Sequence, residues 1–200
     1  SNINIPTRMK IALFFGSFNP VHIGHVALAN YVAEYGNVDK VMMIVSPLNP
    51  LKAGNTLLPN EVRLNMLRKA VEGYSKIEVS DVEFGLPIPS YTYDTLEYLR
   101  REHPEHEYIL LMGADNVEVF SKWRNYDKIL EKYHVMVYPR RGYTDELPYN
   151  NMSRIETPII EVSSTFIRES VEKGRDVRFF LPGGIYDDVC REVRKMKKLQ

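Results

Sequence analysis

Short apolar, β-branched runs alternate along this chain with segments whose apolar residues recur at helical spacing. Met9–Phe15 has the pattern of a buried strand, and Ile23–Tyr35 follows as a helix with Val26, Ala29 and Ala33 on one side. A repeated strand–helix order is satisfied by a parallel sheet whose two faces are covered by helices. The alternation therefore predicts an α/β fold with a doubly wound parallel sheet, which binds ligands at the carboxyl ends of its strands.

The same patterns locate the individual elements. Strands are predicted at Met9–Phe15, Lys40–Val45, Ile77–Val82, Tyr108–Met112, His134–Tyr138 and Ile159–Val162. Helices are predicted at Ile23–Tyr35, Asn60–Tyr74, Tyr93–Glu102, Tyr126–Lys132, Ser164–Lys173 and Gly184–Lys198. Two long connections, Ser46–Pro59 and Arg140–Pro158, are rich in Pro, Asn and Gly, and we expect them to act as binding loops or lids.

Length and charge limit the classes of protein to consider. The 200 residues suit one domain, which we place at residues 9–200, with Ser1–Arg8 as a tail that is poorly ordered or foreign to the native protein. Lysine plus arginine, at 26, equals aspartate plus glutamate, so the positive surplus of a general nucleic-acid binder is missing. We therefore expect no nucleic-acid partner.

Cysteine content and hydropathy bear on the compartment. Cys190 is the only cysteine, which excludes an intramolecular disulfide and a cysteine-based zinc site. No apolar run approaches the length of a membrane span, and no signal peptide is apparent. We expect a cytoplasmic protein without a membrane partner; a homo-oligomer is left open.

The segment GSFNPVHIGH, Gly16–His25, stands between the first predicted strand and the first predicted helix. Gly16 permits a tight exit from the strand, and Gly24 lets a flat base approach the backbone. His22 and His25 lie on one side of a helix start, where free N–H groups and the helix dipole favour an anion. We interpret the segment as a phosphate cradle with accessible imidazole donors. The alternative is a strand-to-helix turn with two exposed histidines.

This segment resembles the H-x-G-H signature of the nucleotidylyltransferase superfamily. Val162–Arg168, with the sequence VSSTFIR, is similar to that superfamily's C-terminal S-S-T-x-I-R motif. Class I aminoacyl-tRNA synthetases share the H-I-G-H string, but they need a second, lysine-rich signature and usually a longer chain. Lys195–Lys198 is only superficially similar to that signature, and a solvated basic helix face is the simpler interpretation.

Three middle segments narrow the resemblance to nicotinate mononucleotide adenylyltransferases of the bacterial type: Pro89–Leu96, Gly113–Asn116 and Lys122–Arg124. The resemblance implies a Rossmann-like nucleotidyltransferase fold. It also implies transfer of the adenylyl group of ATP to nicotinate mononucleotide, with release of pyrophosphate, in NAD biosynthesis. Mg²⁺ is implied as a companion of ATP with few protein ligands, so no protein metal site is expected. The loop Pro47–Lys52 also fits, although Leu51 stands where many relatives have histidine.

The resemblance implies a role for each candidate site residue. His22 and His25 hold the α- and β-phosphates and stabilise charge in the transition state. The residues implied to bind ATP are Gly16, Ser17, Phe18 (chiefly through its backbone), Gly24, Asp115, Ser163, Ser164, Thr165 and Arg168. The residues implied to bind nicotinate mononucleotide are Asn49, Lys52, Thr92, Tyr93, Trp123, Arg124 and Arg140. Within the second group, Trp123 is implied to stack on the pyridine ring.

Ordinary structural roles stay open for several of these residues. Ser163 or Ser164 can cap the helix that follows, Asp115 can cap a short helix, and Trp123 can pack in the core. For function, the alternatives are a sister enzyme acting on phosphopantetheine or a polyol phosphate, and a non-catalytic nucleotide-binding protein.

Overall fold

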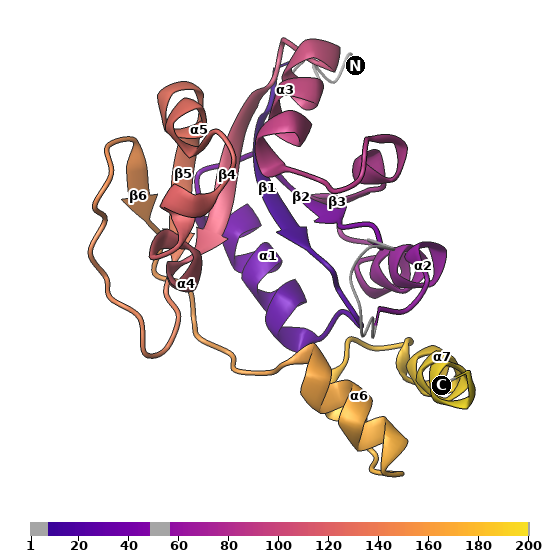
Figure 1. Ribbon diagram of the computed structural model, residues 1–200. Coiled ribbons are helices and arrows are strands. Elements are labelled where there is room, and N and C mark those ends of the chain that lie inside the picture. Colours follow the sequence, from indigo (N-terminus) through magenta and orange to yellow (C-terminus); the bar gives the residue numbers. More distant parts are fainter. Residues whose placement is uncertain (1–7, 49–56, 200) are drawn as a thin grey trace, which may run out of the picture.

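The computed structural model describes residues 8–48 and 57–199. Within these residues, six parallel strands form one sheet in the order β3-β2-β1-β4-β5-β6 (Figure 1). The strands are β1 Lys10–Gly16, β2 Lys40–Val45, β3 Ile77–Ser80, β4 Glu107–Gly113, β5 His134–Tyr138 and β6 Met152–Arg154. The chain winds outward from β1 in one direction and from β4 in the other, so the predicted doubly wound sheet is confirmed.

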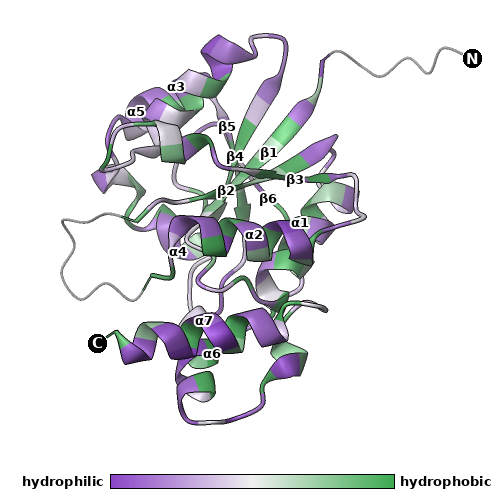
Figure 2. Cartoon of the chain, turned by 90° about the vertical axis from the view of Figure 1, so that its right-hand side faces the viewer, coloured by the Kyte–Doolittle hydropathy of each residue, from purple (hydrophilic) through white to green (hydrophobic). Residues whose placement is uncertain are grey.

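The helices connect these strands. The α-helices are α1 Ile23–Tyr35, α2 Asn60–Ala70, α3 Thr92–Glu102, α4 Ala114–Val117, α5 Tyr126–Lys132, α6 Ser164–Glu172 and α7 Tyr186–Lys198. Short 3-10 turns occur at Val82–Gly85, Phe120–Lys122 and Arg178–Phe180. Helices α6 and α7 lie together at one end of the molecule, beyond α1 and α2 (Figures 1 and 2).

The two faces of the sheet have separate cores. Alternate residues of the central strand β1 point to opposite faces. Ala12 and Phe14 pack with side chains of α1, α2, α6 and α7, whereas Ile11 and Leu13 pack with side chains of α3, α4 and α5. A strand covered on both faces needs apolar residues at every position, which explains why β1 and β4 lack polar alternation.

The last strand is not where its sequence predicted it. The prediction at Ile159–Val162 is wrong: this segment pairs with no strand, and Ile159 and Ile160 are 50% and 42% exposed. The edge strand is β6, within the stretch expected to be a loop, and it pairs in parallel with β5 from Val135↔Met152 to Val137↔Arg154. The three residues of β6, with serine at the centre, carry little apolar signal, and the strand is held by pairing with β5 and by the contact between Ser153 Oγ and the His134 ring at 2.7 Å.

Two helix boundaries differ from the prediction by two residues or more. Helix α2 ends at Ala70 instead of Tyr74, because the chain turns through Gly73, whose φ is +84°. Helix α7 begins at Tyr186 instead of Gly184, whose φ of +87° is incompatible with a right-handed helix. Among the described helices, none has both the length and the apolar composition that crossing a bilayer requires.

Candidate active site

A cavity of about 650 Å³ opens at the carboxyl ends of β1, β4 and β5. This is the edge of the sheet at which the strand order reverses, where parallel sheets bind ligands. Its floor comes from the loops after those strands, and the extended segment 157–163 forms its far wall. The lining includes the predicted site residues Gly16, Ser17, Phe18, His22, Gly24, His25, Asp115, Arg140 and Ser163.

His22 is the N-cap of α1, and it forms a reciprocal capping pair with His25. His22 Nδ1 accepts the Gly24 N–H at 3.1 Å, and His25 Nδ1 accepts the His22 N–H at 3.1 Å. The rings stack with centroids 3.6 Å apart. His22 is only 5% exposed, so the prediction that both histidines are freely accessible is wrong for this one. Its cap contact and the stacked ring keep it buried at the cavity wall.

The capping pair also fixes the protonation of both rings. Burial, followed by the charge of Arg140, lowers the pKa of His22 to about 4. Burial likewise lowers the pKa of His25 well below its usual value of 6.5, with His22 and Arg140 as further causes. Both imidazoles are therefore neutral at pH 7. Because each Nδ1 is an acceptor, the proton resides on Nε2, which leaves each ring one N–H donor for a ligand.

Gly16 and Phe18 shape the loop after β1. Phe18 has a φ of +46° and is buried, with its ring edge-on to Phe14 and to His25 at centroid distances of 5.4 and 5.0 Å. A Cβ on Gly16 would lie 2.9 Å from the Phe18 ring. The absence of a side chain at Gly16 therefore leaves space for the Phe18 ring, which packs against His25. As expected, the Phe18 side chain packs in the core, and only its backbone is available to a ligand.

Gly24 has neighbours that its sequence did not suggest. A Cβ there would lie 2.9 Å from His22 Cε1 and 3.1 Å from the Ile160 carbonyl oxygen. The interpretation that this glycine admits a flat base is therefore incomplete, because the space beside it already holds the His22 ring. Glycine is needed at this position to accommodate the capping imidazole.

The two terminal motifs meet, although they are far apart in sequence. Ser163 caps α6 by accepting the Phe166 N–H at 3.0 Å. Ser164 Oγ donates to the Pro20 carbonyl at 2.8 Å, and Arg168 donates to the Asn19 carbonyl at 2.7 Å. The Ser163 capping role is thus confirmed. Arg168 and Ser164 fasten α6 to the loop after β1, while Thr165 accepts a longer hydrogen bond from Arg168 at 3.3 Å.

Asp115 is the most informative carboxylate of the site. It is the second residue of α4, yet its side chain does not cap that helix, so the capping alternative is wrong. Its Oδ1 is buried and has no hydrogen-bond partner among the described residues. An unpaired buried acceptor is costly, and its presence in a cavity indicates that a ligand donor completes it.

Arg140 brings positive charge into the same cavity. It follows β5 and acts electrostatically on both histidines. The residue was assigned to the mononucleotide, but the structure places it beside the histidines of the phosphate cradle. Its guanidinium can therefore contact phosphates from either substrate.

Four other residues assigned to the mononucleotide, all within the described part of the chain, do not line the large cavity: Thr92, Tyr93, Trp123 and Arg124. Tyr93 lines a smaller cavity of about 410 Å³ at the start of α3, where Thr92 is the first helical residue. Trp123 is half-buried and packs edge-on against Phe120 at 5.2 Å, which matches the core-packing alternative. The Arg124 guanidinium lies 4.6 Å above the Tyr91 ring.

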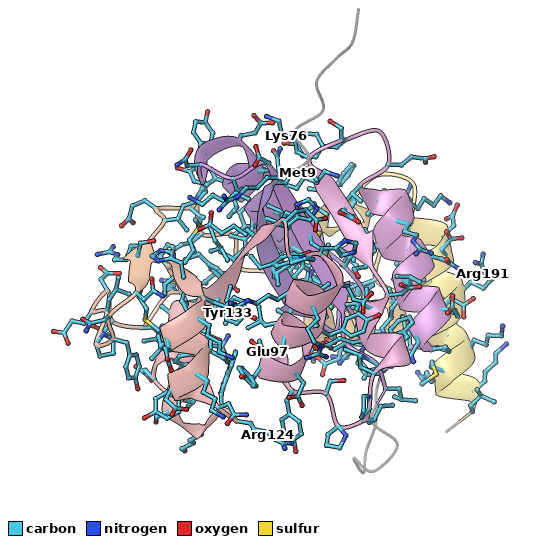
Figure 3. All side chains as sticks on the ribbon, turned by 90° about the horizontal axis from the view of Figure 1, so that it is seen from above. Met9, Lys76, Glu97, Arg124, Tyr133 and Arg191 are labelled. Carbon is cyan, nitrogen blue, oxygen red and sulfur yellow. The ribbon has the colours of Figure 1, made fainter. Side chains whose placement is uncertain are left out.

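A polar bridge holds α3 against the end of α5 beside this smaller cavity. Tyr133 Oη donates to Glu97 at 2.8 Å, and both residues are labelled in Figure 3. Lys132 Nζ donates to Tyr93 Oη at 3.1 Å. The Tyr93 side chain is therefore occupied by a structural contact. Asn49, Lys52 and the unusual Leu51 lie outside the described residues, so their predicted roles stay predictions.

Sequence reasoning missed two parts of the site. One is an apolar wall of Ile160, Phe166 and Phe180, in which the two phenylalanine rings are edge-on at 5.3 Å. The other is Arg63 on α2, which is completely buried and donates to the carbonyl of Ser17. An arginine amid the apolar face of a helix was a signal for the second, since charged residues seldom face a core.

A group of side chains of the kinds that ligate metal ions lies at the opposite end of the sheet, just before β4. Ligand atoms of His103, Glu105 and His106 lie within 4.8 Å of one another. His106 Nδ1 accepts the Met9 N–H at 3.0 Å, so its proton is on Nε2, 3.5 Å from Glu105. A protonated nitrogen offers no lone pair to a metal, and Glu105 lies at the same 3.5 Å from His103 Nδ1.

Comparison with known proteins gives a consistent relationship. Residues 13–170 match the model of the family described as cytidylyltransferase-like. A Flavobacterium johnsoniae protein named "probable nicotinate-nucleotide adenylyltransferase" is 46% identical over 183 residues, which cover 90% of this chain and 95% of that protein. A Bacteroides fragilis protein of the same name is 44% identical, over 92% of this chain and 93% of the relative.

Solved structures agree with the fold. Two structures of the Plasmodium falciparum nicotinic acid mononucleotide adenylyltransferase, complexed with NaAD and with APC, superpose with TM-scores of 0.77 and 0.78. Each covers 94% of this chain, and this chain covers 97% and 98% of theirs. The sequence identity is 16% in both, so the likeness concerns the fold.

Proposed function

This chain belongs to the nicotinate-nucleotide adenylyltransferases, within the cytidylyltransferase-like family, and we propose that it transfers the adenylyl group of ATP to nicotinate mononucleotide. The products are nicotinate adenine dinucleotide, a precursor of NAD, and pyrophosphate. One observation carries the proposal at the level of the site. Two neutral histidines, a cation and an unpartnered carboxylate oxygen line one cavity at the switch point of the sheet.

The reaction needs positioning more than acid–base chemistry. An oxygen of the mononucleotide 5′-phosphate attacks the α-phosphorus of ATP, and a new P–O bond forms. The bond from that phosphorus to the bridging oxygen breaks, and pyrophosphate leaves with the electron pair. The nucleophile is an anion at pH 7, so no general base is required. Neutral Nε2–H donors from His22 and His25, with Arg140, stabilise the charge that develops on the phosphate oxygens.

Different regions of the cavity lining suit the phosphates, the ribose and the adenine of ATP. The histidines, Arg140 and the loop at Ser17 form the polar part, which suits the phosphates. Asp115 Oδ1 accepts a ribose hydroxyl, which satisfies its missing hydrogen bond. The apolar wall at Ile160 and Phe180 suits the adenine ring. Carboxylates are few in the described lining, Asp115 and Glu161, which suits Mg²⁺ arriving with ATP as MgATP.

The mononucleotide is assigned to the side of the sheet where α3 begins. Free N–H groups at the first turn of α3, near Thr92 and Tyr93, suit the nicotinate carboxylate. Trp123 is half-buried, and the proposal assigns its ring to stack on the pyridine. The mononucleotide phosphate then extends toward Arg140 and the histidines, where the two substrates meet.

Pyrophosphate release tests the proposal. The purified protein is incubated with MgATP and, in turn, with nicotinate mononucleotide, nicotinamide mononucleotide and phosphopantetheine. We expect turnover with nicotinate mononucleotide and a dinucleotide product. Turnover with phosphopantetheine alone would assign the chain to the sister enzymes, and binding of ATP without any turnover would favour a nucleotide-binding protein.

A further inference from the structure

Arg63 is a fully buried arginine that makes four hydrogen bonds, one of them to Ser17 in the lining of the cavity. Its side chain comes from the first turns of α2 and is 0% exposed. Nε donates to the Leu58 carbonyl at 2.8 Å, and Nη1 donates to the carbonyls of Ser17 and Ser46 at 2.8 and 2.7 Å. Nη2 donates to Asn60 Oδ1 at 2.7 Å. The guanidinium thus joins the ends of β1 and β2.

The partners of this cation are all neutral. Among the described residues, the hydrogen bonds of Arg63 reach three carbonyls and one amide, and no carboxylate forms an ion pair with it. A buried charge without a counter-charge is costly. The proposed function assigns phosphates to the adjoining cavity, and an anion bound there would offset part of this cost.

The bond to Ser17 has a consequence for the next residue. The Ser17–Phe18 peptide is trans, so its N–H points opposite to the carbonyl that Arg63 binds. Within residues 8–48 and 57–199, the Phe18 N–H donates no hydrogen bond. Phe18 lines the cavity, and its positive φ of 46° turns the backbone there. Cationic polarisation of the carbonyl strengthens the N–H on the other end of the same peptide as a donor.

The bond to the Ser46 carbonyl fixes the chain after β2 in the same way. Asn60 Oδ1 accepts both the Arg63 Nη2–H and the Leu48 N–H, the latter at 2.8 Å. Asn19 Oδ1 accepts the Leu58 N–H at 2.8 Å. One guanidinium therefore ties the loop after β1 to both described ends of the connection between β2 and α2.

We propose that Arg63 is a positioning residue for adenylyl transfer, which fixes the Ser17–Phe18 peptide so that its N–H binds a phosphate oxygen of ATP. The proposal deepens the proposed function and rests on ATP as the ligand of this cavity. Arg63 touches no substrate; it acts through the peptide that it orients, and its charge favours the anionic complex over the empty site.

The test compares Arg63→Met, Arg63→Lys and Arg68→Met. Arg68 is the matched control, because it is on the same helix, carries the same charge and has a half-exposed side chain. We expect Arg63→Met to lower kcat/KM for MgATP by about 10²-fold, the scale of one lost preorganised donor. Arg63→Lys keeps the positive charge but lacks the planar guanidinium with its several donors, so we expect it to recover part of this loss. Arg68→Met behaves as wild type.

A binding measurement separates this proposal from a purely structural role. The probe is the Mg²⁺ complex of α,β-methylene-ATP, followed by the ¹⁵N–¹H NMR signal of Phe18. In wild type and Arg68→Met we expect that signal to move downfield on binding, and in folded Arg63→Lys the shift is reduced. A full Phe18 shift and wild-type kcat/KM in Arg63→Lys, with only thermal stability lowered, would overturn the proposal.

The same measurement distinguishes failure of the proposal from failure of the assigned reaction. If wild type does not form the dinucleotide but binds the analogue with the Phe18 shift, the reaction assignment fails and the Arg63 role stands. If wild type forms the dinucleotide while its Phe18 signal does not move, the Arg63 role fails.

Discussion

His22 combines two roles that a simple helix cap does not. An N-cap is usually Ser, Thr, Asp or Asn, whose side-chain oxygen accepts a backbone N–H. Here an imidazole nitrogen is the acceptor, and the acceptor on one side of the ring forces the proton to the other side. The cap that starts α1 thus leaves the Nε2–H as a donor, which the proposed function assigns to the phosphates, so that one ring would serve both stability and catalysis.

Substitutions at His22 can separate its capping role from its role as an N–H donor. His22→Asn retains a side-chain acceptor for the cap but removes the Nε2–H donor. We expect kcat to fall about 10²-fold, with a melting temperature close to that of wild type. His22→Ala loses both roles and is less stable by about 1 kcal/mol, the usual value of an N-cap. Steady-state kinetics with thermal melts of both variants measure the difference, and equal stability of the two would contradict the capping role.

The neutral histidines also predict a dependence of stability on pH. In the unfolded chain a histidine takes up its proton near pH 6.5, whereas His22 in the folded protein does so only near pH 4. As pH falls through this window, the unfolded chain binds more protons, so the free energy of unfolding decreases. Each such histidine contributes a slope of about 1.4 kcal/mol per pH unit.

Urea unfolding between pH 7.5 and 4.5 measures this slope. We expect His22→Asn and His25→Gln each to flatten it below pH 6.5 and to leave it unchanged above. Slopes identical to wild type throughout would show that the two rings titrate normally in the folded protein.

Helix α6 is the element that completes the site, and it does so through very few contacts with the cradle. Ser164 and Arg168 reach the carbonyls of Pro20 and Asn19, and the segment before the helix forms the far wall of the cavity. The long buried strands and amphipathic helices were predictable from hydrophobic periodicity. Strand β6 and the extended wall at 157–163 were not, because their conformation depends on neighbours that are distant in sequence.

The contacts of α6 give a prediction at this scale. Arg168→Met removes the bond to Asn19 while it keeps the length of the side chain. We expect KM for MgATP to rise about tenfold or more and faster protease cleavage in residues 155–163, since the helix is less firmly held. Lys173→Met, at the exposed end of the same helix, is the control. Unchanged KM and unchanged cleavage would show that α6 is held by its apolar face alone.

At the scale of the whole molecule, the proposed function assigns the two substrates to different parts of the carboxyl end of one sheet. The phosphate cradle follows β1, and the region assigned to the pyridine lies where α3 begins. Sequence motifs predicted the residues of both regions, and the structure brings most of the predicted cradle residues together around one cavity. Motifs did not reveal that Arg63 joins the loops, that Asp115 lacks a partner or that His22 is buried, because these follow from three-dimensional packing.

The pyridine region predicts a preference between acid and amide. Nicotinate offers an anionic carboxylate to N–H donors near Thr92, and a charge-assisted hydrogen bond contributes about 1.5–3 kcal/mol. Two such bonds favour the acid by about 10²-fold or more in kcat/KM, since about 1.4 kcal/mol is tenfold. Trp123→Ala should weaken both substrates alike, because stacking depends on the ring. Competition assays with both mononucleotides measure this; equal efficiencies in wild type would contradict it.

The bonds from α6 to the first loop also matter while the protein is being made. Residues 144 and 149 positions apart must meet before the cavity has its second wall. During translation, His22 and His25 emerge early, whereas α6 emerges only after most of the domain has been translated. A chain that is released prematurely, or cut ahead of α6, therefore lacks a complete nucleotide site.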